Sequence, residues 1–160
     1  FSEDRFRIRQ GGGYAYKDYT DEMTRRGLWH STLAGGVANI WGRLDGQSSA
    51  LGSKPYDHPE WINTWSRFFA QRFRKDMVRD PELTDGVCLR RPDRRHYVFY
   101  KEGAASVGLD LSAMDGPQPS VAVDAVKPYA ERDMGTLPPA KLTWTAPYRS
   151  DWAIAVGESW

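Results

Sequence analysis

The stretch TDEMTRRGLWHSTLAGGVANIWG, residues 20–42, predicts a helix that is followed at once by a buried strand. An acidic pair beginning at Asp21 stands in the expected first turn, and Gly35-Gly36 follows a helix over residues 20–34; both features are common at helix ends. The run over residues 36–42 is short, largely apolar and bounded by glycines. Such a run is typical of a strand buried on both faces of a parallel sheet.

The predicted helix has one face made mostly of small residues. They are Met23, Gly27, Ser31 and Ala34. A face of small side chains lets a helix lie close against a sheet, so we expect this face to be the buried one. Trp29 and His30 lie inside the same helix and are expected to serve packing, because a single helical histidine is usually a structural residue.

A second helix is expected to begin at Pro59, after a loop over residues 43–58 that is rich in glycine, serine, aspartate and proline. Its apolar side chains recur every three or four residues and form a wide stripe beside basic residues. The stripe consists of Trp61, Ile62, Trp65, Phe68, Phe69 and Phe73. This period predicts an amphipathic helix that packs on a core.

Beyond Pro81 the apolar residues recur at every second position. Such alternation is typical of half-buried strands, and turn residues separate the runs. The expected strands cover residues 87–90, 96–101, 107–112, 121–125, 141–144 and 152–156. Short strands with this spacing favour a small antiparallel β-sandwich.

Together these patterns predict two parts, an α/β part over residues 1–80 and an all-β part over residues 81–160. The first part has the element order βαβα and begins with an extended segment over residues 1–9. A parallel sheet of two strands cannot cover itself, so we expect further strands on polypeptide upstream of Phe1. The 160 residues are too few for a complete (β/α)8 barrel.

The composition excludes several classes of protein. Lysine and arginine number 22 against 21 aspartates and glutamates, and a net charge of +1 offers no broad basic surface for nucleic acid. No apolar run reaches membrane-spanning length. The histidines at positions 30, 58 and 96 lack metal-ligand spacing and Cys88 has no partner, so we predict neither a metal site nor a cofactor.

An acidic pair, Glu3 and Asp4, stands at the end of the expected first strand, beside Arg5 and Arg7. Catalytic groups of parallel α/β proteins cluster where strands end, which makes the position suitable for chemistry. Taken from the residues alone, however, an acidic pair beside arginines is more often a solvated salt-bridge cluster.

Residues 17–42, KDYTDEMTRRGLWHSTLAGGVANIWG, with Ser2-Glu3-Asp4-Arg5 before them, resemble the end of the catalytic barrel in the apiosidase-like family of (β/α)8 glycoside hydrolases. In that family a glutamate ends the seventh strand, an arginine-containing helix follows, and a strand closing on an aromatic-Gly pair comes eighth. Residues 97–156 are similar to the family's terminal β-sandwich, once labelled a collagen-binding domain. The resemblance implies the last βαβα portion of a (β/α)8 barrel, followed by that sandwich.

The resemblance also implies that Glu3 is the nucleophile of a retaining mechanism, which needs two carboxyls about 5 Å apart. Arg5 or Arg7 is placed to keep the pKa of Glu3 low and to align its oxygens, and Arg5 is also a candidate for contact with the substrate. Asp4 would point to the opposite face of an extended strand, so the acid/base carboxyl is expected on an earlier strand that this chain lacks. Activity would then require the N-terminal remainder of the protein, on the same or a separate chain.

Four further residues are candidates for contact with the sugar. Trp41 ends the expected eighth strand, where its ring either forms a wall of the sugar subsite or fills the core. Asn39 and Arg43 flank it and offer hydrogen bonds to hydroxyls, although Arg43 is equally suited to a solvated loop. Tyr16 follows the first strand and is expected to reach a ligand.

We therefore predict the C-terminal portion of a retaining glycoside hydrolase that cleaves a plant- or microbe-derived carbohydrate. The family resemblance favours a bacterial protein that is secreted or periplasmic. The alternative is a non-catalytic carbohydrate-binding or structural β-sandwich module with an N-terminal helical linker. A sugar-binding sheet needs aromatic residues lined up on an exposed face, whereas Trp144 and Trp152 alternate as core residues do.

Overall fold

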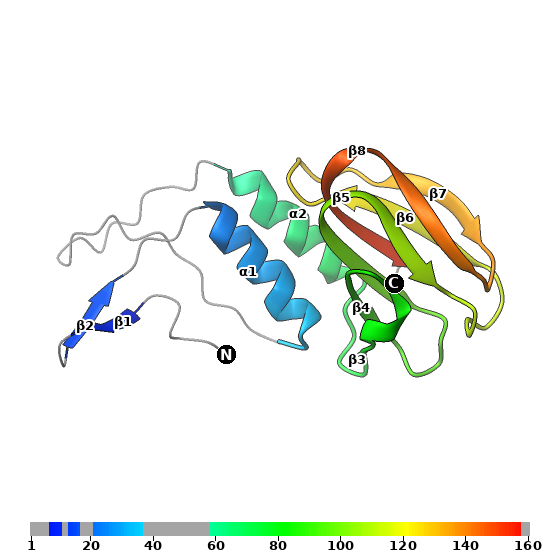
Figure 1. Cartoon of the computed structure of the whole chain (residues 1–160), viewed down its shortest axis with the longest axis horizontal. Helices are drawn as coiled ribbons and strands as arrows, with labels where there is room; N and C mark the ends of the chain where they lie inside the picture. The colour runs from blue at the N-terminus through cyan, green and yellow to red at the C-terminus, as the bar shows by residue number, and fades with distance from the viewer. Residues whose placement is uncertain (1–6, 11–12, 17–20, 37–57, 158–160) are drawn as a thin grey trace.

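The computed structural model describes residues 7–10, 13–16, 21–36 and 58–157 (Figure 1). The helices in these ranges are α1 (Asp21–Leu33), α2 (Pro59–Ala70) and a short 3-10 helix at Pro81–Leu83. The strands are β1 (Arg7–Gln10), β2 (Gly13–Tyr16), β3 (Val78–Arg79), β4 (Val87–Arg90), β5 (Tyr97–Asp110), β6 (Gln118–Asp124), β7 (Arg132–Leu137) and β8 (Lys141–Val156). None of the helices in the described ranges has the length and apolar character needed to cross a membrane.

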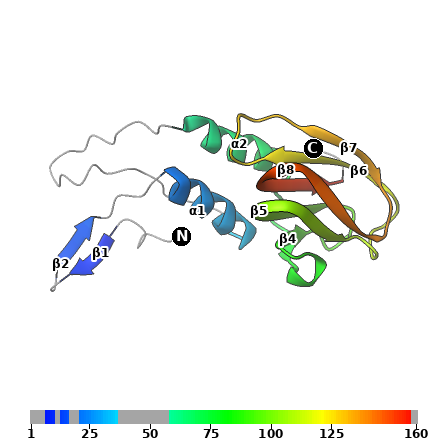
Figure 2. The ribbon, with the colours of Figure 1, turned by 45° about the horizontal axis from the view of Figure 1, so that its top comes forward.

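Six strands form one antiparallel sheet in the order β3-β4-β5-β8-β6-β7. The long strands β5 and β8 lie at its centre and pair from Tyr97 opposite Val156 onward. Their register shifts between Lys101 and Ser106, where Gly103 has a φ of 55° that suits glycine. Such irregularities bend a strand pair, and Figures 1 and 2 show β5 and β8 curving along their length.

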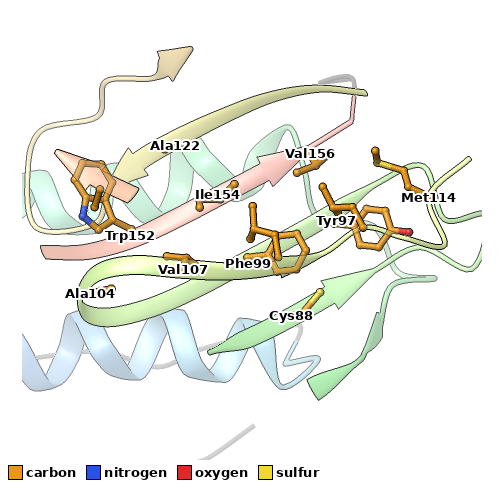
Figure 3. Packing of buried hydrophobic residues seen from close by; sticks show 13 residues of the cluster. Cys88, Tyr97, Phe99, Ala104, Val107, Met114, Ala122, Trp152, Ile154 and Val156 are labelled. Carbon is orange, nitrogen blue, oxygen red and sulfur yellow. The ribbon is translucent and has the colours of Figure 1, made fainter. Parts of the chain in front are cut away.

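Side chains of the central strands alternate between two cores. In β5, Tyr97 and Phe99 face one core, whereas Val98 and Tyr100 face the other. The first core brings together residues from both halves of the curved strands, as Figure 3 shows for part of it. Its members include Cys88, Tyr97, Phe99, Val107, Leu109, Leu111, Trp152 and Ile154. The ring centroids of Trp152 and Trp144 lie 5.1 Å apart in an edge-to-face arrangement, so both tryptophans belong to this core.

The second core lies between the sheet and the two α-helices. Trp29 of α1 is fully buried, and its ring stacks on Tyr100 of β5 with 4.9 Å between centroids. Phe68 and Phe69 of α2 pack against the same indole at 5.3 and 5.2 Å. Because burial of each large apolar side chain contributes on the order of 2 kcal/mol, these rings hold the helices on the sheet.

The predicted boundaries of the first helix are confirmed, and its end has a clear cause. The Gly36 N–H donates to the Ser31 carbonyl at 2.8 Å, and the Gly35 N–H donates to the Thr32 carbonyl at 2.9 Å. Gly35 has a φ of 88°, which only glycine adopts without strain. These two bonds form a Schellman motif that satisfies carbonyls at the end of α1.

The prediction of which face of this helix is buried is wrong. Met23 is 40% exposed, and Ala34 is exposed as well. The buried residues of α1 are Thr24, Arg25, Leu28, Trp29, Thr32 and Leu33. Trp29 and Leu28 offer far more apolar area than the small residues do, so their burial decides how the helix is turned. The packing role predicted for Trp29 is confirmed.

The second predicted helix is confirmed as α2, which ends at Ala70. Phe68 and Phe69 of its apolar stripe are buried, and Trp61 and Trp65 are half-buried. Phe73 lies beyond the end of the helix and packs beside the same core. The 3.6-residue period therefore identified the correct face of this helix.

The predicted βαβα barrel portion is wrong. The first strand, β1, pairs antiparallel with β2, with Arg7 opposite Tyr16, and every strand pair within the described ranges is antiparallel. Helices α1 and α2 pack on the sheet formed by the second half of the chain. Periodicity reports which faces of a strand are buried and not the direction of its neighbour, which is why the sequence misled here. The strand expected up to residue 42 lies outside the described residues.

The second half also differs from the predicted arrangement, because its strands form one curved sheet. The runs expected at residues 96–101 and 107–112 belong to the single strand β5, and those at 141–144 and 152–156 belong to β8. The edge strands β3 and β7 were not predicted. The division of the chain at residue 80 stays a prediction.

Candidate functional site

Most residues predicted to act on substrate lie outside the described part of the chain. They are Glu3, Arg5, Asn39, Trp41 and Arg43. Tyr16 is the last residue of β2, where its backbone pairs with Arg7. The roles of all six residues therefore stay predictions.

A charged cluster joins α1 to the central strands of the sheet. Arg25 of α1 is only 4% exposed and donates from Nη1 to Asp151 Oδ2 at 2.5 Å. The same nitrogen lies 3.4 Å from the hydroxyl of Tyr100. The other oxygen of Asp151 accepts the backbone N–H of Gly103 at 2.7 Å, so the carboxylate also fixes the bend of β5. This ion pair ties one face of the helix to both long strands.

Glu102 forms the outer part of this cluster. Its carboxylate accepts hydrogen bonds from Arg26 Nε at 2.9 and 3.0 Å and bonds to His30 Nε2 at 2.9 Å. Burial alone would raise the pKa of Glu102, but the bonds from Arg26 and His30 outweigh it, and the pKa lies below its ordinary value. Glu102 is therefore an ionised group.

The cluster is suited to holding the helix and not to proton transfer. A general acid for glycoside cleavage must be protonated near neutral pH, and the lowered pKa of Glu102 excludes that role. Burial raises the pKa of the Tyr100 phenol, which keeps it neutral. His30 is 45% exposed, and its ring meets Tyr100 edge-on with 5.7 Å between centroids while Nε2 bonds Glu102, which agrees with the structural role predicted for it.

A groove opens beside this cluster, at the end of α1. It has a volume of about 570 Å³ and lies between the helix terminus, the edge strand β3 and its neighbour β4. Figure 1 shows the end of α1 beside β4. Among the described residues, the polar side chains that line it are His30, Ser31 and Arg79. Gly35 lies at its rim, where an added Cβ would meet no atom within 4 Å.

Within the described ranges, no three histidine, cysteine, aspartate or glutamate side chains are placed to hold one metal ion. Cys88 is fully buried in the first core, and burial raises the pKa of its thiol. A buried thiol with a raised pKa is unreactive, so this cysteine serves packing.

The charged cluster was missed from the sequence, although one signal for it was present. Arg25 and Arg26 stand in the middle of a helix that must bury one face, so at least one of them requires an acidic partner. The partners, Glu102 and Asp151, lie 76 and 126 residues away in the chain. Nothing in local sequence identifies partners at that distance.

Comparison with solved structures finds the same fold in two larger proteins. No protein-family model and no curated protein matches the chain. A solved structure of a glycoside hydrolase matches 88% of the chain with a TM-score of 0.68 and 13% identity. A glycoside hydrolase family 5 structure from Bacteroides vulgatus ATCC 8482 matches 89% with a TM-score of 0.62 and 13% identity. The chain spans 37% of the length of each, and at this identity the likeness shows a shared fold.

Proposed function

We propose that this chain is part of a glycoside hydrolase. The observation that supports the proposal is the shared fold, which extends over nearly nine tenths of the chain in two solved glycoside hydrolases. The charged cluster and the two aromatic cores of the described region are structural. In this proposal the sheet and its helices form a supporting unit beside the catalytic centre.

The catalytic nucleophile in this proposal is Glu3, acting in a retaining mechanism. The resemblance of residues 17–42 to the apiosidase-like family supports this assignment. Hydrolysis needs a second, protonated carboxyl close to the first. The proposal assigns this second carboxyl to polypeptide outside the chain, and the greater length of the two matching hydrolases is consistent with that.

The sugar would be held by side chains from the same part of the chain. Trp41 would stack on one face of the ring, and Asn39, Arg43 and Tyr16 would bond its hydroxyls. Arg5 would keep Glu3 ionised. The substrate class proposed is a plant- or microbe-derived carbohydrate.

The test is the substitution Glu3→Gln in the complete hydrolase. Removing a nucleophile while keeping its shape should lower kcat by more than about a thousandfold, with little effect on stability. Asp4→Asn is the matched control, because it changes the adjacent carboxylate in the same way, and it should retain most activity. Steady-state hydrolysis of aryl glycosides measures both variants. If Glu3→Gln retains wild-type turnover, Glu3 has no role in the reaction.

The alternative, a non-catalytic sugar-binding module, finds less support in the described aromatic residues. Trp152 is buried, and the ring of Tyr148, which is 41% exposed, is already occupied. The ammonium of Lys127 lies 4.0 Å from the centroid of the Tyr148 ring, and the indole of Trp152 lies 5.2 Å from it. A sugar that stacks on an aromatic platform needs a free ring face.

A further inference from the structure

We propose that the groove at the end of α1 binds the carboxylate of an acidic sugar, such as a uronic acid residue in a polysaccharide. The inference rests on the proposed function, because it takes the ligand to be a carbohydrate. The groove volume of about 570 Å³ falls within the range of about 300–1,000 Å³ that is typical of small-molecule sites. It accommodates a sugar ring.

Strand register directs Arg79 to the groove side of the sheet. Arg79 of β3 lies opposite Leu89 of β4, and residues directly opposite each other share a face. Leu89 belongs to the core beneath the helices, and Val87 of the same strand packs against that core. The side chain of Arg79 therefore lies on the face that α1 covers, where it lines the groove together with His30.

Among the described residues, no acidic side chain pairs with Arg79. Three acidic residues lie within three positions of it in the chain; Glu82 forms no ion pair with it, and the other two are engaged by other arginines. Asp80 accepts from Arg90 Nε at 2.7 Å, and Asp76 accepts from Arg91 Nη2 at 3.0 Å. Arg79 forms no ion pair or hydrogen bond with any residue that the structure describes, and none of the described residues that line the groove carries a carboxylate. An exposed guanidinium in this state is free to bind a carboxylate with two parallel hydrogen bonds.

The remaining polar groups suit the hydroxyls of a sugar. The hydroxyl of Ser31 has no hydrogen-bond partner in the described part of the chain. Glu102 binds Nε2 of His30, which fixes the ring and leaves Nδ1 available. Nδ1 of a histidine accepts a hydrogen bond from a hydroxyl or donates one to it, depending on protonation, and the serine both donates and accepts. One cationic fork beside two hydroxyl-binding groups matches a sugar acid better than a simple inorganic anion.

The experiment titrates the 160-residue chain with methyl glucuronide, methyl glucoside and inorganic phosphate, followed by amide chemical shifts in NMR. We expect saturable shifts at residues 31, 35, 36 and 79 with the glucuronide, and binding at least tenfold weaker for the other two probes. Arg79→Ala should weaken glucuronide binding at least tenfold, and Arg79→Lys should weaken it less because the charge remains. Arg132→Ala is the matched control on the opposite edge strand and should leave binding unchanged.

Three results would overturn the inference: no shifts with glucuronide, equal binding of phosphate, or unchanged binding in Arg79→Ala. Hydrolysis assays keep this separate from the proposed function. If the complete protein hydrolyses glycosides but the groove does not bind glucuronide, only the acidic-sugar inference is refuted. A chain that binds glucuronide through Arg79, while the complete protein cleaves no glycoside, refutes the proposed function and leaves a sugar-acid site.

Discussion

Two arginines on either side of the junction between α1 and the sheet differ in what compensates their charge: Arg25 belongs to α1, and Arg79 belongs to β3. Arg25 is buried and pairs with Asp151, whereas Arg79 lies exposed on an edge strand without a partner among the described residues. The charged cluster and the groove share His30, which bonds Glu102 and also lines the groove. In the described part of the chain, compensated charge fixes the helix on the sheet, whereas the guanidinium of Arg79 at the adjacent groove has no acidic partner.

The largest effect should come from breaking the compensated pair. Asp151→Ala leaves the Arg25 guanidinium buried without its carboxylate, and such a loss costs about 3–5 kcal/mol of unfolding free energy. Urea denaturation measures the change. The control is Asp115→Ala, whose carboxylate is 74% exposed and 3.8 Å from Arg95, and it should cost less than about 1 kcal/mol. Equal losses in the two variants would contradict the structural role of the cluster.

A smaller effect should appear in the pH dependence of stability. The pKa of Glu102 is lowered in the folded chain from an ordinary value of 4.5. A lowered folded pKa stabilises the protein above the unfolded pKa, and this contribution is lost as the pH falls through the folded pKa. The wild type should therefore lose stability below about pH 4.5 more steeply than Glu102→Gln.

Urea midpoints measured at pH 6 and pH 3 in the two proteins give this comparison. Glu60→Gln serves as the control, because the pKa of Glu60 is also lowered, but by its own backbone N–H and by His58 two positions earlier on the same helix end, not by a contact with the sheet. If the urea midpoint falls by the same amount between pH 6 and pH 3 in the wild type and in Glu102→Gln, Glu102 contributes nothing to the attachment of α1.

The smallest effect on stability should come from Arg79→Ala. An exposed side chain without a partner contributes little, so the unfolding free energy should change by less than about 0.5 kcal/mol. Arg25→Ala, measured in the same urea series, should cost several times more. A large loss in Arg79→Ala would mean that Arg79 serves the fold, and the contrast between the two arginines would fail.

The sequence predicted those elements whose periodicity reflects burial. The stripe of α2 was correct because large apolar side chains recur at one helical spacing. Strand β7 was missed because most of its residues are exposed on both faces, so it carries no alternation. The predicted buried face of α1 was wrong because Trp29 and Leu28 bury more apolar area than Met23 and the three small residues of that face would. Residues at its two ends predicted where that helix begins and ends, whereas packing on the sheet determines which of its faces is buried.

Strand direction and the candidate site were less accessible. The glycine-bounded run after α1 suggested a parallel sheet, yet apolar content alone does not distinguish parallel from antiparallel neighbours. The groove depends on β3 meeting the end of α1, and that contact joins residues more than forty positions apart. Residues such as Glu3 and Trp41 were assigned through family resemblance, and those assignments await experiment.

The most direct test of the account traps the intermediate of the proposed reaction. A retaining hydrolase forms a covalent glycosyl-enzyme, and a 2-deoxy-2-fluoro glycoside slows its breakdown enough for mass spectrometry of the digested protein. The account predicts one added sugar on the peptide that contains Glu3, and none in Glu3→Gln. A label on another carboxylate, or turnover with inversion at the anomeric carbon, would contradict it.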